Sequence, residues 1–244
     1  AGAILYHYSK RLLSLREEAE SALHSFLGKL KGDLNIGGST IPSGYILPKL
    51  IGPFSSSYPD IKIMLSAGDT MEIIQKLKSG AIELGIVGAR IDDPGIVQER
   101  LITDEMKLIL PGDHRWANEK QVDCELLFQE PFIAREKGSG TWRSILASFN
   151  EAGYDPDRLK TTITMGNTTS VIQGILNKAG ISIMSTMAVQ DEIERGRLAA
   201  LQVKGVNLIR YFYLTLAKKR SQSPICEKFI QYTLSQYDSK TNDI

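Results

Sequence analysis

The chain of 244 residues contains little cysteine, which limits the kinds of site it can build. Only Cys124 and Cys226 are present, and they lie far apart in the sequence. This spacing excludes a CxxC pair, the usual arrangement of zinc ligands and a disulfide framework. We therefore expect reduced thiols in the cytoplasm and no bound metal.

An excess of charge of one sign is also missing. The 29 Lys and Arg residues against 28 Asp and Glu residues leave a formal net charge of +1. A protein that binds nucleic acid on its own usually carries a clear positive excess, because it must neutralise phosphates. These residues are therefore not expected to hold DNA by charge alone.

Long apolar runs are absent as well. No run approaches the roughly 18 residues that a membrane-spanning helix requires, and the first residues lack the order of a signal peptide. With 42% hydrophobic residues, the length suits one large domain or two small ones, each able to bury a core. We expect a cytoplasmic protein without a membrane partner.

Catalytic motifs are missing from the sequence. It contains no GxSxG, HExxH, GxGxxG or Walker lysine loop. Of the three histidines, His7 and His24 lie in the first segment and His114 lies in a polar turn, so no pair can activate a nucleophile. We expect no catalytic residue, no cofactor and no enzymatic activity; an enzyme would need a nucleophile or base that the sequence does not show.

What the chain does have is a narrow apolar seam in its first segment. The seam residues are spaced alternately three and four positions apart, which is typical of a coiled coil. A helix lying on its own domain usually carries a wider apolar stripe, so we expect residues 1–31 to form a linker and dimerisation helix. The alternative is an amphipathic helix packed on its own domain. The seam consists of Leu5, Tyr8, Leu12, Leu15, Ala19, Ala22 and Phe26.

After residue 32, short apolar runs alternate with helical patterns. This alternation predicts an α/β fold with mostly parallel sheets and helices on both faces. The series restarts after residues 111–123, which favours two sheets, and residues 237–244 are expected to be a disordered tail. The predicted strands are residues 34–38, 61–66, 84–87, 107–110, 132–134, 161–165, 181–184 and 208–216. The predicted helices are residues 42–56, 70–79, 141–152, 168–178, 188–195 and 224–236.

Four of these strands lead into small hydroxyl and glycine residues where a helix begins. At such a start, free backbone N–H groups and the positive end of the helix dipole lie at the carboxyl edge of a parallel strand, where α/β proteins bind ligands. Four such ends facing one cleft would bind a small anion or a polar molecule. The candidate effector-binding residues are Ser39, Thr40, Gly68, Asp69, Thr70, Gly138, Ser139, Gly140, Thr141, Asn167, Thr168 and Thr169.

Each start also has a plainer interpretation, since Ser, Thr and Asn are ordinary helix caps. Ser39 or Thr40 can cap the helix at residue 42, and residues 68–70 can be a tight turn. The start at residues 138–141 is more specific, because two glycines lie there beside cations that would favour an anion. Those cations are Arg135, Lys137 and Arg143. The run Lys218, Lys219 and Arg220 is better explained as a solvated strand end.

The order of several short motifs resembles the effector-binding part of LysR-type bacterial transcriptional regulators, from about residue 32 to residue 236. The individual motifs are common, but their order and spacing are specific. They are residues 32–37 (GDLNIG), 47–48 (LP), 58–60 (YPD), 83–86 (ELGI), 113–117 (DHRWA), 135–141 (REKGSGT), 178–182 (KAGIS) and 223–224 (SP), with Phe54, Leu77 and Gly80.

The resemblance implies two lobes of Rossmann-like mixed sheet, similar to type II periplasmic binding proteins, with an effector bound between them. Lobe I would comprise residues 33–104 and 207–236, and lobe II residues 105–206. The ligand loops of the family fall on the four helix starts named above, and a helix before the lobes pairs subunits. A helix-turn-helix DNA reader precedes that helix in the family and is absent from these residues.

The functional expectation is a ligand-sensing and dimerising part of a LysR-type transcription regulator. Its effector would be a carboxylate, sulfate, phosphate or polar metabolite, its partner a second copy in a dimer or tetramer, and its DNA contact would pass through the absent domain. The alternative is a solute-binding protein of a transport system with the same two-lobed fold. The pairing helix and the absence of a signal peptide count against that alternative.

Overall fold

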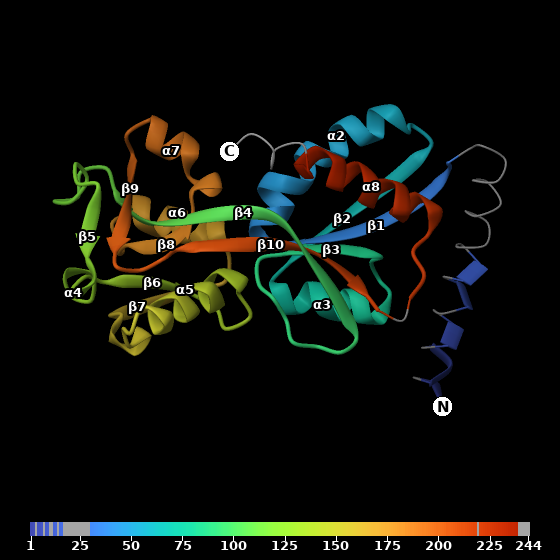
Figure 1. Ribbon diagram of the computed structural model, residues 1–244, viewed down its shortest axis with the longest axis horizontal. Helices are drawn as coiled ribbons and strands as arrows, with labels where there is room; N and C mark the ends of the chain where they lie inside the picture. Colours follow the sequence, from blue (N-terminus) through green and yellow to red (C-terminus); the bar gives the residue numbers. More distant parts are fainter. Residues whose placement is uncertain are drawn as a thin grey trace. The chain divides into compact units, whose positions relative to one another are not determined.

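The computed structural model describes residues 1–2, 4–6, 8–9, 12–13, 15–16, 30–218 and 220–238, and it divides the chain into two compact units (Figure 1). Unit 1 is Ala1–Gly68, Glu72–Leu101 and Tyr213–Ile244, and unit 2 is Asp69–Met71 and Ile102–Phe212. The chain passes between the units inside two long strands, β4 (Ile96–Pro111) and β10 (Ile209–Ala217). The boundaries predicted between lobe I and lobe II, at residues 104–105 and 206–207, lie a few residues inside unit 2.

Unit 1 is built on a sheet with the strand order β2-β1-β3-β10. Strand β1 pairs in parallel with β2 and with β3, and β10 pairs antiparallel to β3. Helices α2 and α8 lie on one face of this sheet and α3 on the other (Figure 1). The elements are β1 (Gly32–Ser39), η1 (Pro42–Ile46), α2 (Leu47–Ser57), β2 (Ile61–Gly68), α3 (Thr70–Ser79), β3 (Leu84–Val87) and α8 (Pro224–Asp238).

The core of unit 1 forms where amphipathic helices cover the buried strands. Ile73 and Leu77 of α3 are fully buried and pack with Val87 of β3. On the other face, the rings of Phe54 in α2 and Phe229 in α8 meet edge to face, with centroids 5.0 Å apart. Burying such side chains supplies about 1.5–3 kcal/mol each, so these helices are held against the sheet by apolar contact.

Unit 2 contains a mixed sheet and a separate strand pair. Strand β4 pairs antiparallel with β8 and with β9, β9 pairs in parallel with β5, and β6 pairs in parallel with β7. Its main apolar cluster includes Leu110, Phe132 and Phe149. The elements are β5 (Gln121–Asp123), α4 (Cys124–Leu127), β6 (Phe132–Arg135), α5 (Gly140–Glu151), η2 (Pro156–Arg158), β7 (Thr161–Met165), α6 (Thr168–Leu176), β8 (Ser182–Ser185), η3 (Thr186–Ala188), α7 (Gln190–Glu194) and β9 (Leu198–Lys204).

The α/β class and the mixed sheets are confirmed, but the expectation of mostly parallel pairing from strand and helix alternation is wrong in part. Antiparallel pairs join β3 to β10 and β4 to both β8 and β9. The sequence analysis missed β5 and β9, and it predicted only the end of the 16-residue strand β4. In the first half of β4, polar and charged residues interrupt the apolar ones, and none of residues 96–103 is fully buried, so this half lacks the apolar run that marked the other strands.

The structure describes only part of each end of the chain, and the predictions for the two ends are compared with that part. Leu5, Tyr8, Leu12 and Leu15 are helical and strongly exposed, whereas Ala19, Ala22 and Phe26 of the predicted seam lie outside the described residues. Helix α8 includes Tyr237 and Asp238, which the sequence analysis assigned to the tail; residues 239–244 of that tail lie outside the described part.

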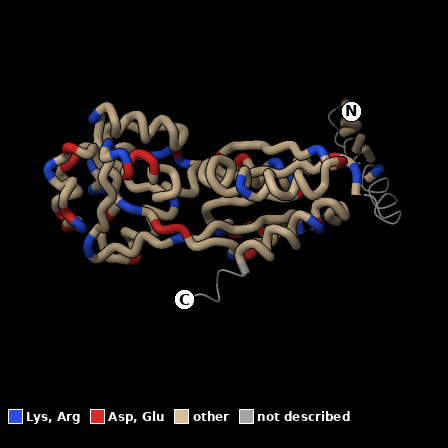
Figure 2. Tube along the Cα trace, turned by 90° about the horizontal axis from the view of Figure 1, so that it is seen from above, with Lys and Arg blue, Asp and Glu red and all other residues tan. Residues whose placement is uncertain are grey.

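Charged residues of both signs are interspersed along the chain (Figure 2). In the part of the chain that the structure describes, no helix is long and apolar enough to cross a membrane. The same part contains no group of three His, Cys, Asp or Glu side chains arranged to hold a metal ion.

Candidate functional site

Two helix starts lie side by side in unit 2, because the strands that lead into them are neighbours. Strand β6 leads to α5 and strand β7 leads to α6, and β6 and β7 pair in parallel. Their carboxyl ends therefore reach the same edge of the strand pair. The first backbone N–H groups of each helix have no partner within the helix, so this edge carries donors and the positive ends of two helix dipoles.

Each of these helix starts is fixed by a side-chain cap. The Oγ of Ser139 accepts a hydrogen bond of 3.3 Å from the backbone N–H of Trp142 in α5. The Oδ1 of Asn167 accepts one of 2.8 Å from the backbone N–H of Ser170 in α6. The caps confirm the two predicted helix starts as local structure.

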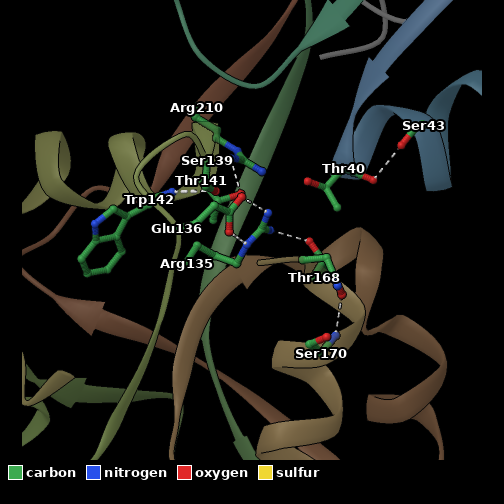
Figure 3. A network of polar contacts seen from close by, with 11 residues as sticks. Thr40, Ser43, Arg135, Glu136, Ser139, Thr141, Trp142, Thr168, Ser170 and Arg210 are labelled. Carbon is green, nitrogen blue, oxygen red and sulfur yellow. Dashed lines mark hydrogen bonds and ion pairs between the residues drawn. The ribbon is translucent and has the colours of Figure 1, made fainter. Parts of the chain in front are cut away.

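Arg135, at the end of β6, connects the two starts. Its side chain is buried; its Nε and Nη2 each donate to the Glu136 carboxylate at 2.8 Å, and its Nη1 donates to the Thr168 hydroxyl at 2.9 Å (Figure 3). Thr168 is the first residue of α6, so the guanidinium ties that helix to β6. Its charge is compensated by a carboxylate that it holds in a bidentate pair.

Arg210 is a second buried cation of the site, and the sequence analysis missed it. From β10, its Nε donates to Asp104 Oδ2 at 2.7 Å and its Nη1 donates to the hydroxyl of Thr141 at 3.0 Å. The other oxygen of Asp104 accepts a hydrogen bond of 2.6 Å from Ser185. These contacts connect the first turn of α5 to strands β4, β8 and β10.

One amino group of Arg210 has no hydrogen-bond partner among the residues that the structure describes. The side chain is only 6% exposed, and its Nη2 is buried without a hydrogen bond to any described residue. Burial lowers the pKa of the Arg210 guanidinium and Asp104 counteracts this, while the charge of Arg135 lowers it further. A buried donor without a partner costs about 1–3 kcal/mol, and more when it is charged. This nitrogen is therefore a position where an added acceptor would stabilise the protein.

The sequence does contain a signal for Arg210 and Asp104. In β10, every second residue from Arg210 to Leu214 is buried, so Arg210 faces the same side as Phe212 and Leu214. In β4, Asp104 and Met106 are buried in the same way. An ionisable residue in the inward-facing series of a strand is rarely buried without a partner. This signal lies inside strands, whereas the predicted site residues lie at helix starts.

The first predicted helix start lies in unit 1 and differs from the expectation. The structure has Ile41, not Ser39 or Thr40, at the cap position of η1, and no side chain caps it. The hydroxyl of Ser43 instead donates to the Thr40 backbone carbonyl at 3.3 Å (Figure 3). The predicted cap is therefore wrong, because residues 42–46 wind as a π-helix before α2 begins.

The close approach at this turn depends on Gly38. A Cβ atom there would lie 2.7 Å from the backbone nitrogen of Ser43 and 2.9 Å from its Cα. Only glycine leaves room for the chain to fold back so closely. Ser39, next along the strand, is buried.

The second predicted start is divided between the units. Gly68 ends β2 in unit 1, while Asp69 and Thr70 belong to unit 2. Thr70 begins α3 and is fully buried, and its hydroxyl has no hydrogen-bond partner among the described residues. Its interaction with a ligand remains a prediction.

Two further predicted residues lie close together, since a Cβ atom on Gly138 would clash with the Asp69 carboxylate. Lys137 and Arg143 are exposed, and Gly138 is half-buried. Asn167 and Thr169 line an open hollow of about 690 Å³ beside Gln173 on α6. Of the run at residues 218–220, Lys218 is exposed, and Lys219 lies outside the described residues. The structure thus brings together Ser139, Gly140, Thr141, Thr168 and Arg135, and adds Arg210 and Asp104.

The two cysteines do not supply a nucleophile. Both thiols are buried, and burial raises the pKa of Cys124 to about 11 and also raises that of Cys226. The thiolate is the reactive form of cysteine, so neither side chain is activated at neutral pH.

Comparison with known proteins identifies the family. The LysR substrate binding domain matches residues 27–238. The transcriptional activator CmpR of Synechocystis is 29% identical over 235 residues, which are 95% of this chain and 75% of CmpR. The CcmR regulatory domain of Synechocystis, solved with 2-PG, has a TM-score of 0.77 at 24% identity and covers 85% of this chain and 98% of its own.

A second solved structure gives the same fold. The effector-binding domain of QuiR, solved with shikimate, has a TM-score of 0.77 at 22% identity, and the match covers 86% of this chain and 98% of the QuiR chain. The family match and the similarity to CmpR support regulation of transcription and not the alternative of a transport protein. Since the family match spans most of its length, this chain belongs to the LysR substrate binding domain family and is a ligand-sensing part of a transcription regulator.

Proposed function

We propose that unit 2 binds a small organic anion at the adjoining starts of α5 and α6, and that this anion is the effector of the regulator. The observation that carries the proposal is the unpartnered Nη2 of Arg210 next to the first turn of α5. Ser139, Thr141 and Thr168 lie at the same two helix starts. Oxyanions are stabilised at such helix ends by backbone donors and by the dipole.

The ligands of the structurally similar domains support an anion. CcmR was solved with 2-PG and QuiR with shikimate, and both molecules carry a carboxylate. An organic anion with one carboxylate or phosphate group and polar substituents also suits the hydroxyls of Thr141 and Thr168, which can rotate to meet different oxygens.

The exposed part of the first helix is the basis for proposing a second copy of the chain as partner. Leu5, Tyr8, Leu12 and Leu15 are between 55% and 69% exposed, which is costly for such a series of apolar side chains. We propose that they pair with the same helix of a second copy, in a dimer or tetramer. DNA contact is assigned to a DNA-reading domain of the whole regulator, acting in the cytoplasm.

A thermal-shift panel tests the effector proposal. The chain would be heated with acetate, sulfate, inorganic phosphate, shikimate or 2-phosphoglycolate, at constant ionic strength set with sodium chloride. A ligand that binds the folded chain raises Tm by mass action, so at least one organic anion should raise it progressively with concentration. Glycerol at the same concentrations controls for solvent effects. If none of these anions raised Tm above the chloride reference, the proposal would be wrong.

A further inference from the structure

The two buried arginines of the site differ in how their donors are used. Each of the three side-chain nitrogens of Arg135 donates to Glu136 or Thr168. Arg210 donates through Nε and Nη1 only, and its Nη2 is left without a protein partner. The two residues are alike in burial, so this difference separates a cation with a structural role from one with capacity for a ligand.

Neither the Asp104 nor the Glu136 carboxylate accepts a hydrogen bond from Arg210 Nη2. Both oxygens of Asp104 accept hydrogen bonds, one from Ser185 and one from Arg210 Nε, and neither reaches Nη2. Glu136 is held by Arg135. The Asp69 carboxylate, which lies against Gly138, does not bond Nη2 either, so an acceptor for Nη2 must come from outside the described residues.

The direction of Arg210 places that acceptor at the helix start. Its Nη1 is bonded to Thr141 in the first turn of α5, and Figure 3 shows the guanidinium groups of Arg210 and Arg135 extending toward the same region of unit 2. The charge of Arg135 also acts on Arg210, as its contribution to the pKa of Arg210 shows. Two cations and the dipole of α5 thus act on an atom bound to Nη2.

We infer that Arg210 is the residue that selects an anionic effector, by donating from Nη2 to a carboxylate or phosphate oxygen. The inference rests on the proposed function and adds to it the residue that distinguishes an anionic effector from a neutral one. A hydrogen bond between two charged groups is roughly twice as strong as one between neutral groups, so Arg210 favours a carboxylate over the carboxamide of the same acid. Arg135 takes the positioning role, because its donors hold Glu136 and Thr168.

The test must remove Arg210 without leaving Asp104 as an unpaired buried charge, which would destabilise the fold. The double variant Asp104→Asn/Arg210→Gln removes both charges and leaves the net charge unchanged. Arg195→Gln is the control, because Arg195 is an exposed arginine of the same unit. Circular dichroism and the ligand-free Tm would verify that both variants are folded.

Calorimetric titration would use shikimate and its carboxamide, which differ only in the charged group, and 2-phosphoglycolate as a second acid. We expect the unmodified chain and Arg195→Gln to prefer the acid, and the double variant to bind it about tenfold more weakly or worse while its preference over the amide disappears. Asp104→Asn alone should keep the preference, since Arg210 remains.

Equal affinity and equal preference in the double variant would overturn the role of Arg210 while leaving the proposed function intact. Absence of binding to the unmodified chain would overturn both. Should the double variant fail to fold, Arg210→Lys supplies the same test, because lysine keeps the charge but cannot reach three partners at once. Unchanged acid affinity in that variant would also contradict the inference.

Discussion

At the scale of single residues, the site depends on hydroxyls that accept hydrogen bonds from buried arginines. Thr141 accepts from Arg210 and Thr168 accepts from Arg135, and both side chains are buried. The hydroxyls can still donate their own protons, so one oxygen can hold the arginine and bind an anion simultaneously. The threonines can therefore stabilise the fold and, in the proposed function, also bind the ligand.

Replacing Thr141 should affect both properties. Thr141→Ala removes the acceptor of Arg210 Nη1 and leaves a second buried donor without a partner, so we expect the free energy of unfolding to fall by about 1–3 kcal/mol. Urea denaturation measures this change. Thr141→Ser keeps the hydroxyl and should recover most of the loss. A stability equal to that of the unmodified chain in Thr141→Ala would show that this hydrogen bond contributes nothing.

At the scale of elements, the sequence predicted the parts of the site that depend on local rules. The helix starts at Ser139 and Asn167 follow from the preference of Ser and Asn for cap positions, and both caps are present. Strand alternation marks Asp104 and Arg210 as inward-facing, but their ion pair joins residues far apart in sequence, so capping and periodicity do not predict the pairing itself. Strand β9 was missed because its pairing with β4 is equally non-local.

The turn between β1 and η1, where the predicted side-chain cap is absent, can be tested by substitution. Gly38→Ala would place a Cβ atom 2.7 Å from the Ser43 backbone nitrogen, which cannot move as a side chain end can. We expect the free energy of unfolding to fall by about 1–3 kcal/mol, measured by urea denaturation. Gly44→Ala is the matched control in η1, the same turn, where a Cβ meets nothing within 4 Å. It should leave stability unchanged or raise it by up to about 1 kcal/mol. Equal effects at the two glycines would contradict this account of the turn.

At the scale of the whole molecule, the small net charge and the exposed first helix point to different parts of the function. A net charge of +1 gives the chain little attraction to DNA, so its contribution to regulation is expected to come from the effector and from pairing. Pairing two copies would bury apolar side chains that the described fold leaves exposed, such as Leu5 and Leu12. In the proposed function, a dimer is the feature that would connect a neutral sensor to a DNA-binding regulator.

The heptad seam can be tested with two neighbouring leucines that are similarly exposed. Leu12 lies on the predicted seam and is 68% exposed, while Leu13 lies off the seam and is 54% exposed. A charge inside a coiled-coil seam is desolvated without a partner, so Leu12→Asp should shift the chain from dimer toward monomer. Light scattering at tens of micromolar measures this, and Leu13→Asp should remain dimeric. An unmodified chain that is monomeric, or equal dissociation in the two variants, would mean that the seam does not pair the copies, because only a specific seam distinguishes adjacent positions of one helix.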